Sequence, residues 1–249
     1  MRVMVVDDDV ISRMALMEIL QGTLPMGIVE AENIDNAWEL LQTPFMPLAI
    51  FCDLHMPGGS GVELVKRIRA NPLLAETLVV LVTAAVDHAT VLTLTKLGVS
   101  GGIVKPFEGQ AVRAKVLKLF NDMQSKWMEK ADSVMARLHI DTNRYLTYIG
   151  NLNTQTAMLL AELDRLLAEK PSSLAPFEEK LDALHAGCLS LGLHLCTKLL
   201  DKLRHSLKHQ GLLQSTKPAL QDVQKLVALA GAIVKKASGQ SQGGSVELF

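Results

Sequence analysis

The sequence has little of what marks a membrane, secreted or zinc-finger protein. No segment runs about 18 apolar residues without a charge, which a membrane-spanning helix requires. The apolar run near the N-terminus is short and stops at three acids, unlike a secretory signal. The three cysteines, Cys52, Cys188 and Cys196, form no C-x-x-C pair, which predicts buried thiols rather than disulfides or a zinc site. We therefore expect a soluble, cytoplasmic protein that does not associate with membranes.

Strong charge of either sign is also absent, because the net charge of the 249 residues is −1. Residues 1–124 carry 10 basic and 14 acidic side chains, and residues 125–249 carry 15 basic and 12 acidic ones. Neither half has the basic face, the helix-turn-helix or the finger pattern of a nucleic-acid-binding domain. We therefore expect no nucleic-acid partner, and the length favours two domains over one.

The first part of the chain alternates short β-rich runs with segments whose apolar residues recur at helical spacing. The runs are VMVV (3–6), GIVEA (27–31), LAIFC (48–52), LVVLV (78–82) and GGIV (101–104). Such regular alternation predicts a parallel sheet covered on both faces. Five strand-helix units in about 120 residues fit a flavodoxin-like α/β fold with a doubly wound five-stranded parallel sheet.

Polar residues follow four of these strands, at the edge where doubly wound sheets bind ligands. They are Asp7, Asp8, Asp53, Thr83 and Lys105. Carboxylates gathered at one edge repel one another unless a cation neutralises them, and Mg²⁺ prefers such oxygen ligands. A carboxylate can attack a phosphoryl donor while a metal, a lysine and a hydroxyl neutralise the transferred group. Taken singly, each residue could instead be structural, since an acidic run such as 7–9 can also begin a helix.

Four motifs occur in order along this part of the chain: VVDDD (5–9), CDLHMPGGSG (52–61), VTA (82–84) and VKPF (104–107). In order and spacing they resemble the receiver domains of two-component response regulators, which have a CheY-like fold, over residues 1–124. The resemblance implies a signalling protein and not an enzyme in the ordinary sense, although a receiver promotes its own phosphorylation and dephosphorylation.

The same resemblance implies a role for each residue of the motifs. Asp53 is expected to be the phosphoacceptor. Mg²⁺ is expected to be held by Asp7, Asp8, Asp53 and the backbone carbonyl of His55. The phosphoryl oxygens are expected to contact Thr83, Ala84 and Lys105.

Two positions depart from the receiver pattern. Gly102 stands three residues before the lysine, where the family often has a Tyr or Phe that moves inward on phosphorylation. The usual aromatic readout is therefore absent. His55 occupies a position whose side chain influences the lifetime of the phosphoryl group in this family.

From Phe107 to about Ala237 the pattern is helical, without a strand signal. Breaks are predicted at Gly150, at KPSSLAP (170–176), at Gly192, at HQG (209–211) and before Pro218. Segment 108–140 is predicted to be a single long helix that leads out of the sheet. The expected domains are a receiver (1–122), a linker helix (123–140), an all-α bundle (141–237) and a flexible polar tail (238–249).

The predicted helix over 176–192 has two distinct faces at 100° per residue. The buried stripe spans about 80° and contains Leu181, Leu184, Cys188 and Leu191. The outward face contains Asp182, His185, Ala186 and Leu189. This outward face is either a modest docking surface or an ordinary solvated one.

The order of helices over 140–237 resembles the histidine phosphotransfer (HPt) domains of phosphorelays, which are up-down bundles with an exposed histidine. The family pattern is His-x-Leu-Lys-Gly followed by a Leu-Gly pair, and Leu191-Gly192 sets the register here. Asp182 then occupies the histidine position, and His185 and Ala186 occupy the basic and small positions. An ion pair between His185 and Asp182, one turn away, would favour the imidazolium, which is a poor nucleophile.

These features predict a response regulator whose bundle is an HPt-like domain without its phosphorylation site, which we call a pseudo-HPt. Its expected partners are a sensor histidine kinase, an HPt protein or another receiver, and its expected effect is inhibition of phosphotransfer. The alternative is an active relay intermediate in which His185 carries the phosphoryl group. A phosphatase would need a Gln or Asn on the outward face, which Asp182 does not supply.

Overall fold

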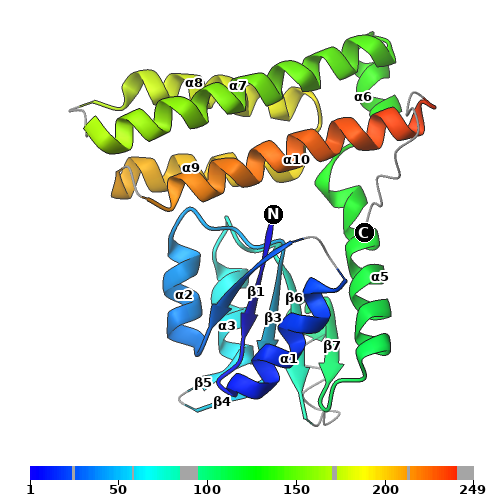
Figure 1. Ribbon diagram of the computed structural model, residues 1–249, viewed down its shortest axis with the longest axis vertical. Helices are drawn as coiled ribbons and strands as arrows, with labels where there is room; N and C mark the ends of the chain where they lie inside the picture. Colours follow the sequence, from blue (N-terminus) through cyan, green and yellow to red (C-terminus); the bar gives the residue numbers. More distant parts are fainter. Residues whose placement is uncertain (24–25, 58, 85–94, 170–172, 212–213, 240–249) are drawn as a thin grey trace. The chain divides into compact units, whose positions relative to one another are not determined.

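The computed structural model describes residues 1–23, 26–57, 59–84, 95–169, 173–211 and 214–239. The described residues divide into two compact units between Asn121 and Asp122. The first unit contains the sheet, and the second contains only helices among its described residues (Figure 1). The predicted α/β fold followed by an all-α region is confirmed.

The first unit is a parallel sheet in the order β2-β1-β3-β6-β7. Its strands are β1 (Arg2–Val6), β2 (Gly27–Ala31), β3 (Ala49–Asp53), β6 (Leu78–Thr83) and β7 (Gly101–Val104). Its helices are α1 (Val10–Gln21), α2 (Ile34–Gln42) and α3 (Gly61–Ala70). Helix α5 (Gly109–Trp127) begins in the first unit and ends in the second. A short antiparallel hairpin, which the sequence did not predict, joins β4 (His55–Met56) to β5 (Gly59–Ser60).

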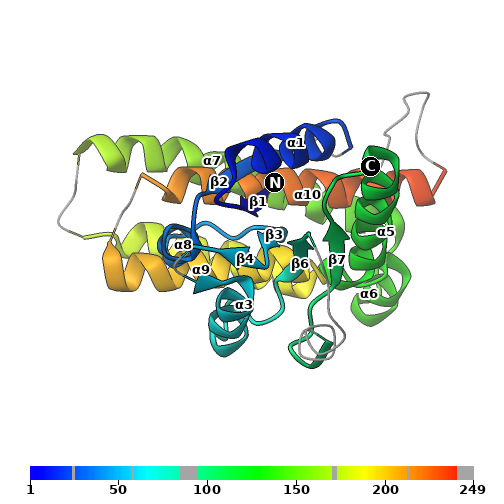
Figure 2. The same cartoon turned by 90° about the horizontal axis from the view of Figure 1, so that it is seen from below.

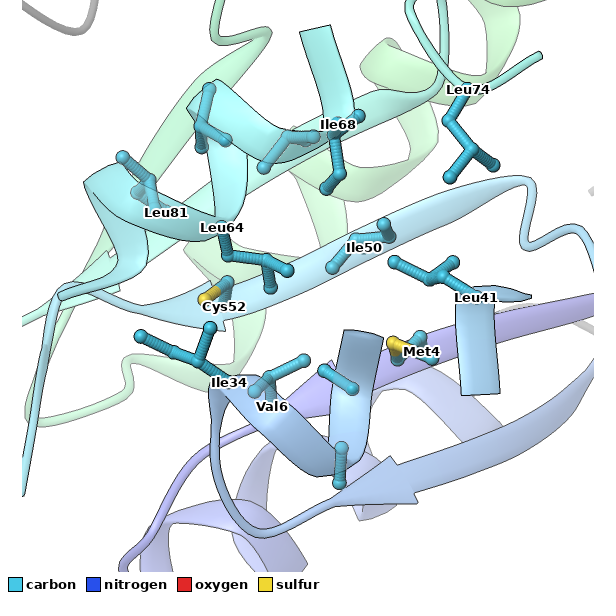
Figure 3. Close-up of a cluster of buried hydrophobic side chains, with 14 of the residues drawn as sticks. Met4, Val6, Ile34, Leu41, Ile50, Cys52, Leu64, Ile68, Leu74 and Leu81 are labelled. Carbon is cyan, nitrogen blue, oxygen red and sulfur yellow. The ribbon is translucent and has the colours of Figure 1, made fainter. Parts of the chain in front are cut away.

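Alternate residues of the strands point to opposite faces of the sheet. Nearly every strand residue is apolar because both faces of a parallel sheet are buried under helices. On one face, Met4, Ile50 and Cys52 pack with side chains from α2 and α3, such as Leu41 and Leu64 (Figure 3). Cys52 is fully buried, and desolvation raises the pKa of its thiol. All three cysteines are buried and free, as predicted.

The second unit is built on four helices that pack in a ring: α7 (Thr142–Glu169), α8 (Ala175–Ser190), α9 (His194–Gln210) and α10 (Thr216–Ala237). Each packs against the next in sequence, and α10 closes the ring against α7 (Figure 1). The short helix α6 (Ala131–Leu138) precedes them. Figure 2 shows the same four helices from another side.

The prediction of one helix over 108–140, and with it a linker helix over 123–140, is wrong. Helix α5 ends at Trp127 and α6 begins at Ala131. Between them, the amide of Glu129 donates to the carbonyl of Gly192 at 2.8 Å instead of continuing the helical ladder. A hydrogen bond to a residue far along the chain therefore ends this helix.

The predicted break at Gly150 is also wrong, because Gly150 lies inside α7 on its exposed side. Glycine in a helix interior costs about 0.5–1 kcal/mol, which the packing of a 28-residue helix outweighs. The other predicted breaks coincide with helix ends, where Gly192 and Gly211 adopt positive φ. Most of the predicted tail, residues 240–249, lies outside the described residues.

Candidate functional site

Residues at the carboxyl ends of β1, β3 and β7 meet in one acidic pocket, formed by Asp7, Asp8, Asp53 and Lys105. The Lys105 Nζ atom lies 2.8 Å from Oδ2 of Asp7 and 2.5 Å from Oδ2 of Asp53. One carboxylate oxygen from each of the three aspartates lies within 4.8 Å of the others. The structure therefore brings together the three acids and the lysine that the sequence singled out.

Burial makes this concentration of charge costly. Asp7 and Asp53 are buried, whereas Asp8 is exposed. Desolvation raises the pKa of Asp7, against the lowering effect of Lys105 and of the Asp9 amide. Desolvation lowers the pKa of Lys105, but its contacts with Asp53 and Asp7 outweigh that effect and raise it. The lysine therefore stays protonated beside the acids.

The pocket suits a small divalent cation. Oδ2 of Asp7 is fully buried and has no hydrogen-bond partner of good geometry, although Lys105 lies within ion-pair distance. An unsatisfied buried carboxylate oxygen is costly unless a cation approaches it. Three carboxylate oxygens this close provide the hard oxygen ligands that Mg²⁺ prefers. The donor set therefore fits Mg²⁺.

The third acid of the DDD run has a different role. Asp9 is exposed and caps α1, because its carboxylate accepts hydrogen bonds from the amides of Ile11 and Ser12 at 3.3 and 3.1 Å. These bonds lower the pKa of Asp9. Both readings of the acidic run therefore hold, because two of its residues belong to the pocket and one begins a helix.

The loop after Asp53 depends on close approach of backbone to backbone. Ser60 caps α3 by accepting from the amide of Val62 at 3.2 Å, and its hydroxyl donates to the carbonyl of Leu54. A Cβ atom at Gly61 would overlap the carbonyl oxygen of Asp53. Glycine at position 61 therefore allows α3 to start directly beside the buried aspartate.

Replacing Gly61 with alanine is expected to destabilise the protein by about 1–3 kcal/mol, because α3 must move away from Asp53. The matched control is Gly150→Ala in α7, where a Cβ meets no atom within 4 Å. That change should stabilise the protein by about 0.5–1 kcal/mol. Urea unfolding midpoints measure both effects. Equal midpoints for Gly61→Ala and the wild type would contradict the close packing described for this loop.

The remaining predicted pocket residues lie around Asp53. The His55 amide donates to Oδ1 of Asp53 at 3.1 Å, which orients the carboxylate. Thr83 is buried at the end of β6, and its carbonyl accepts from the Lys105 amide at 2.8 Å. Ala84 follows it and is exposed. These residues border the pocket, and their contacts with a phosphoryl group stay a prediction.

Among the described residues, none would crowd a Cβ atom at Gly102, where the receiver pattern often has an aromatic ring. Gly102 lies in β7 beside Leu81 of β6, and a Cβ there would come no closer than 3.7 Å to the Leu81 carbonyl oxygen. The Gly102 carbonyl accepts a hydrogen bond from Nζ of Lys115, on α5. Crowding by the described residues therefore does not require a glycine here, and Lys115 of α5 contacts the backbone at this position.

The two faces predicted for the helix over 176–192 are those of α8. The predicted inner stripe is at most 4% exposed, so its burial is confirmed. On the outward face, Asp182, Ala186 and Leu189 are exposed, and His185 is half-buried. Leu189 is 55% exposed, so this face presents an apolar side chain beside the charged ones.

The charged partners of this face come from α9, and the sequence did not predict them. Arg204 Nε lies 2.5 Å from Oδ1 of Asp182. His185 Nε2 lies 2.9 Å from Oδ1 of Asp201, without the geometry of a hydrogen bond, and is itself buried. The expected ion pair between His185 and Asp182 is therefore replaced by two pairs that cross to α9. These partners depend on how α9 is rotated against α8. The spacing of residues within one helix does not predict that rotation.

The doubly wound sheet gathers three carboxylates and a lysine at the ends of its strands, the edge where such folds bind ligands. Among known families, the response regulator receiver domain matches residues 3–117. The chemotaxis protein CheY1 of Helicobacter pylori is 33% identical over 116 residues, which cover 47% of this chain and 94% of that protein. A CheY homolog of Campylobacter jejuni is 34% identical over 116 residues, 47% of this chain and 89% of that protein.

A solved receiver protein from Pseudomonas putida is 28% identical, with a TM-score of 0.43, and covers 49% of this chain and 95% of that one. The chain belongs to the response regulator receiver family. Receiver domains are signalling proteins of two-component systems that are phosphorylated on an aspartate and interact with histidine kinases and phosphotransfer proteins. None of the described helices is both long enough and apolar enough to cross a membrane.

Proposed function

We propose that this chain is a response regulator phosphorylated on Asp53, whose helical bundle is a pseudo-HPt that binds a kinase or another receiver and inhibits phosphotransfer. Phosphorylation on Asp53 is supported by the Lys105 ammonium, which contacts both Asp7 and Asp53 inside a pocket of three carboxylates. The assignment of the bundle as a pseudo-HPt is supported by a carboxylate, Asp182, on the exposed face of α8 where an HPt domain has its histidine.

The chemistry at Asp53 is a direct phosphoryl transfer. A carboxylate oxygen of Asp53 forms a bond to phosphorus as the bond between phosphorus and the donor's leaving group breaks. The amide of His55 holds the other carboxylate oxygen in place. Lys105 neutralises charge on the transferred group. Mg²⁺, for which Asp7, Asp8 and Asp53 supply ligand oxygens, would neutralise the remaining charge.

The bundle is proposed to bind without accepting phosphate. An HPt domain needs an imidazole nitrogen that is exposed and free to attack, and Asp182 offers a carboxylate already paired with Arg204. The only histidine on this face, His185, has its Nε2 buried against Asp201. A nitrogen that is buried against a carboxylate of the same bundle is not accessible to a phosphoryl donor on another protein. These contacts support binding over the rival relay function through His185.

The proposal is tested by phosphorylating the full-length protein with labelled acetyl phosphate or a cognate kinase and mapping the label. The expected label lies on Asp53 and shows the base lability of an acyl phosphate. An acid-labile, base-stable label on His185 would contradict the pseudo-HPt proposal and favour the relay.

A route from the receiver to the outward face of α8 is proposed through the segment after α5. Three consecutive carbonyls at the end of α8 accept hydrogen bonds from three different segments. Ser190 accepts from Arg137 at 3.1 Å, Leu191 from the Tyr145 hydroxyl at 2.9 Å, and Gly192 from the Glu129 amide at 2.8 Å. Arg137 also contacts the Glu129 carboxylate at 2.9 Å.

These contacts tie the end of α5 to the helix turn that carries Leu189. Desolvation and the Glu129 carboxylate raise the pKa of Tyr145 to about 12, so its hydroxyl remains a hydrogen-bond donor at neutral pH. A Cβ at Gly192 would overlap Glu129, so only glycine admits this approach. A displacement of α5 on phosphorylation would therefore reach α8 through Glu129.

Hydrogen exchange is expected to change at residues 128–130 and 189–193 when the receiver is phosphorylated. The aromatic readout at Gly102 is absent, so a smaller change is expected around that residue. Arg137→Gln should reduce the response of 189–193 several-fold, because it removes the contacts to Glu129 and Ser190. Arg165→Gln is the control, since its contact with Glu169 is long, at 3.9 Å, and exposed. A large change around Gly102 with none at 128–130 would contradict this route.

A further inference from the structure

Arg13 lies in the first half of α1 and is buried, although its side chain carries a full charge. Its Nη1 atom donates to the backbone carbonyl of Asp7 at 2.6 Å. Its Nε atom donates to Oε2 of Glu30, on β2, at 3.0 Å. The guanidinium therefore links the end of β1 to the neighbouring strand from the helix that follows the acidic residues.

The carbonyl that Arg13 contacts belongs to the peptide between Asp7 and Asp8. This peptide is planar, so a hydrogen bond to its oxygen restrains the orientation of the plane that contains the Cα atoms of both aspartates. The Asp7 carboxylate has a separate restraint, because the Asp9 amide donates to its Oδ1 at 3.0 Å. Arg13 therefore restrains the peptide from which both Asp7 and Asp8 extend.

The position of the guanidinium is itself fixed by its second contact, with the Glu30 carboxylate. The guanidinium is a rigid planar fork, so anchoring Nε on the Glu30 carboxylate directs Nη1 at the Asp7 carbonyl. A lysine has one ammonium on a flexible stem and cannot reproduce both contacts in this geometry. The Glu30 side chain is 47% exposed, so the carboxylate that offsets the buried charge stays hydrated.

We propose that Arg13 is a positioning residue for the cation site of the acidic pocket, acting through the backbone of Asp7. The inference rests on the proposed function, in which Asp7 and Asp8 bind Mg²⁺. Groups that orient metal ligands without touching the metal change metal affinity by roughly 10–100-fold when they are replaced. Arg13→Met should therefore raise the Kd for Mg²⁺ by about tenfold or more.

The experiment titrates the full-length, unphosphorylated protein with Mg²⁺ alone and measures heat release. Arg13→Met removes both contacts and keeps an apolar stem, and Arg13→Lys keeps the charge but not the fork. The lysine variant should fall between the methionine variant and the wild type. Arg67→Met is the matched control, because Arg67 on α3 also pairs with two carboxylates, Glu63 and Asp35, on the surface. It should bind Mg²⁺ as the wild type does.

Urea unfolding without Mg²⁺ separates positioning from simple stabilisation. A lower midpoint with an unchanged Kd in Arg13→Met would overturn the inference and leave the proposed function standing. If Arg13→Met does not fold, Arg13→Lys is used in its place, and an unchanged Kd for Mg²⁺ in that variant would overturn the inference. Wild-type protein that binds no Mg²⁺ would overturn the proposed cation site itself, and the inference with it.

Discussion

Asparagine in place of Asp53 is expected to abolish phosphorylation of the full-length protein by acetyl phosphate or a cognate kinase. The amide lacks the anionic oxygen that attacks phosphorus, and it loses the ion pair with Lys105. The rate should fall roughly 10⁴-fold or more, as it does when other enzymatic nucleophiles are removed. The measurement is the amount of base-labile label per protein molecule with Mg²⁺ present. The residue is nearly isosteric, so the amide of His55 keeps its acceptor and the fold should be retained.

Asp9→Asn is the matched control, because it makes the same chemical change two residues from Asp7. Asp9 caps α1, and asparagine caps helices as well as aspartate does. This variant should therefore be labelled like the wild type. Chelation of divalent ions before the donor is added should prevent labelling of both proteins, and Asp8→Ala should raise the Mg²⁺ concentration that labelling requires. Undiminished base-labile label on another carboxylate of Asp53→Asn would show that the phosphoacceptor is assigned wrongly.

The fold and the acidic pocket were predictable because local patterns determine them. Each strand of the parallel sheet is a short β-rich run, and in such sheets the residues after the strands gather at one edge. Asp7, Asp53 and Lys105 each follow such a run directly, which is why sequence alone placed them together. The inner stripe of α8 was predictable for the same reason, since its apolar residues recur at the helical period.

Most of the features that sequence reasoning missed depend on contacts between different helices and strands. The end of α5 at Trp127 is set by a hydrogen bond between Glu129 and Gly192, which lie 63 positions apart in the numbering. The link from Arg13 to the Asp7 carbonyl requires α1 to return along β1. The partners of Asp182 depend on how α9 is rotated. Periodicity assigns a face to each helix, but it does not say which residues of a neighbouring helix meet that face.

Arginine in place of Leu189 is expected to remove the inhibition of phosphotransfer by the full-length protein. Leu189 is exposed next to Ala186 on the outward face of α8, so a charge there would be desolvated when a partner docks. The expected cost is roughly 2 kcal/mol, or about thirtyfold in Kd. The measurements are affinity for the kinase or receiver, and the rate at which a cognate kinase phosphorylates its own phosphotransfer partner in the presence of each variant.

Asp182→Ala should leave binding within about threefold of the wild type, because surface ion pairs contribute little. Lys180 and His185 lie near Asp182 on α8 but do not pair with it. Lys180 instead contacts Glu162 at 2.8 Å, and Arg204 pairs with Asp182. With Asp182 removed, Arg204 remains 3.5 Å from Asp201 and keeps a positive charge at the edge of the outward face. An acidic partner should therefore still dock on the variant.

Met158→Arg is the matched control for Leu189→Arg, since Met158 is 67% exposed and lies on α7, outside the outward face of α8. It should inhibit phosphotransfer as the wild type does, with unchanged helix content by circular dichroism. Equal loss of inhibition in Met158→Arg and Leu189→Arg would contradict docking through α8, because any added surface charge would then suffice.

His185→Ala decides between binding and relay. If this change abolished a measurable phosphotransfer through the bundle, the pseudo-HPt proposal would fail and His185 would be the relay residue.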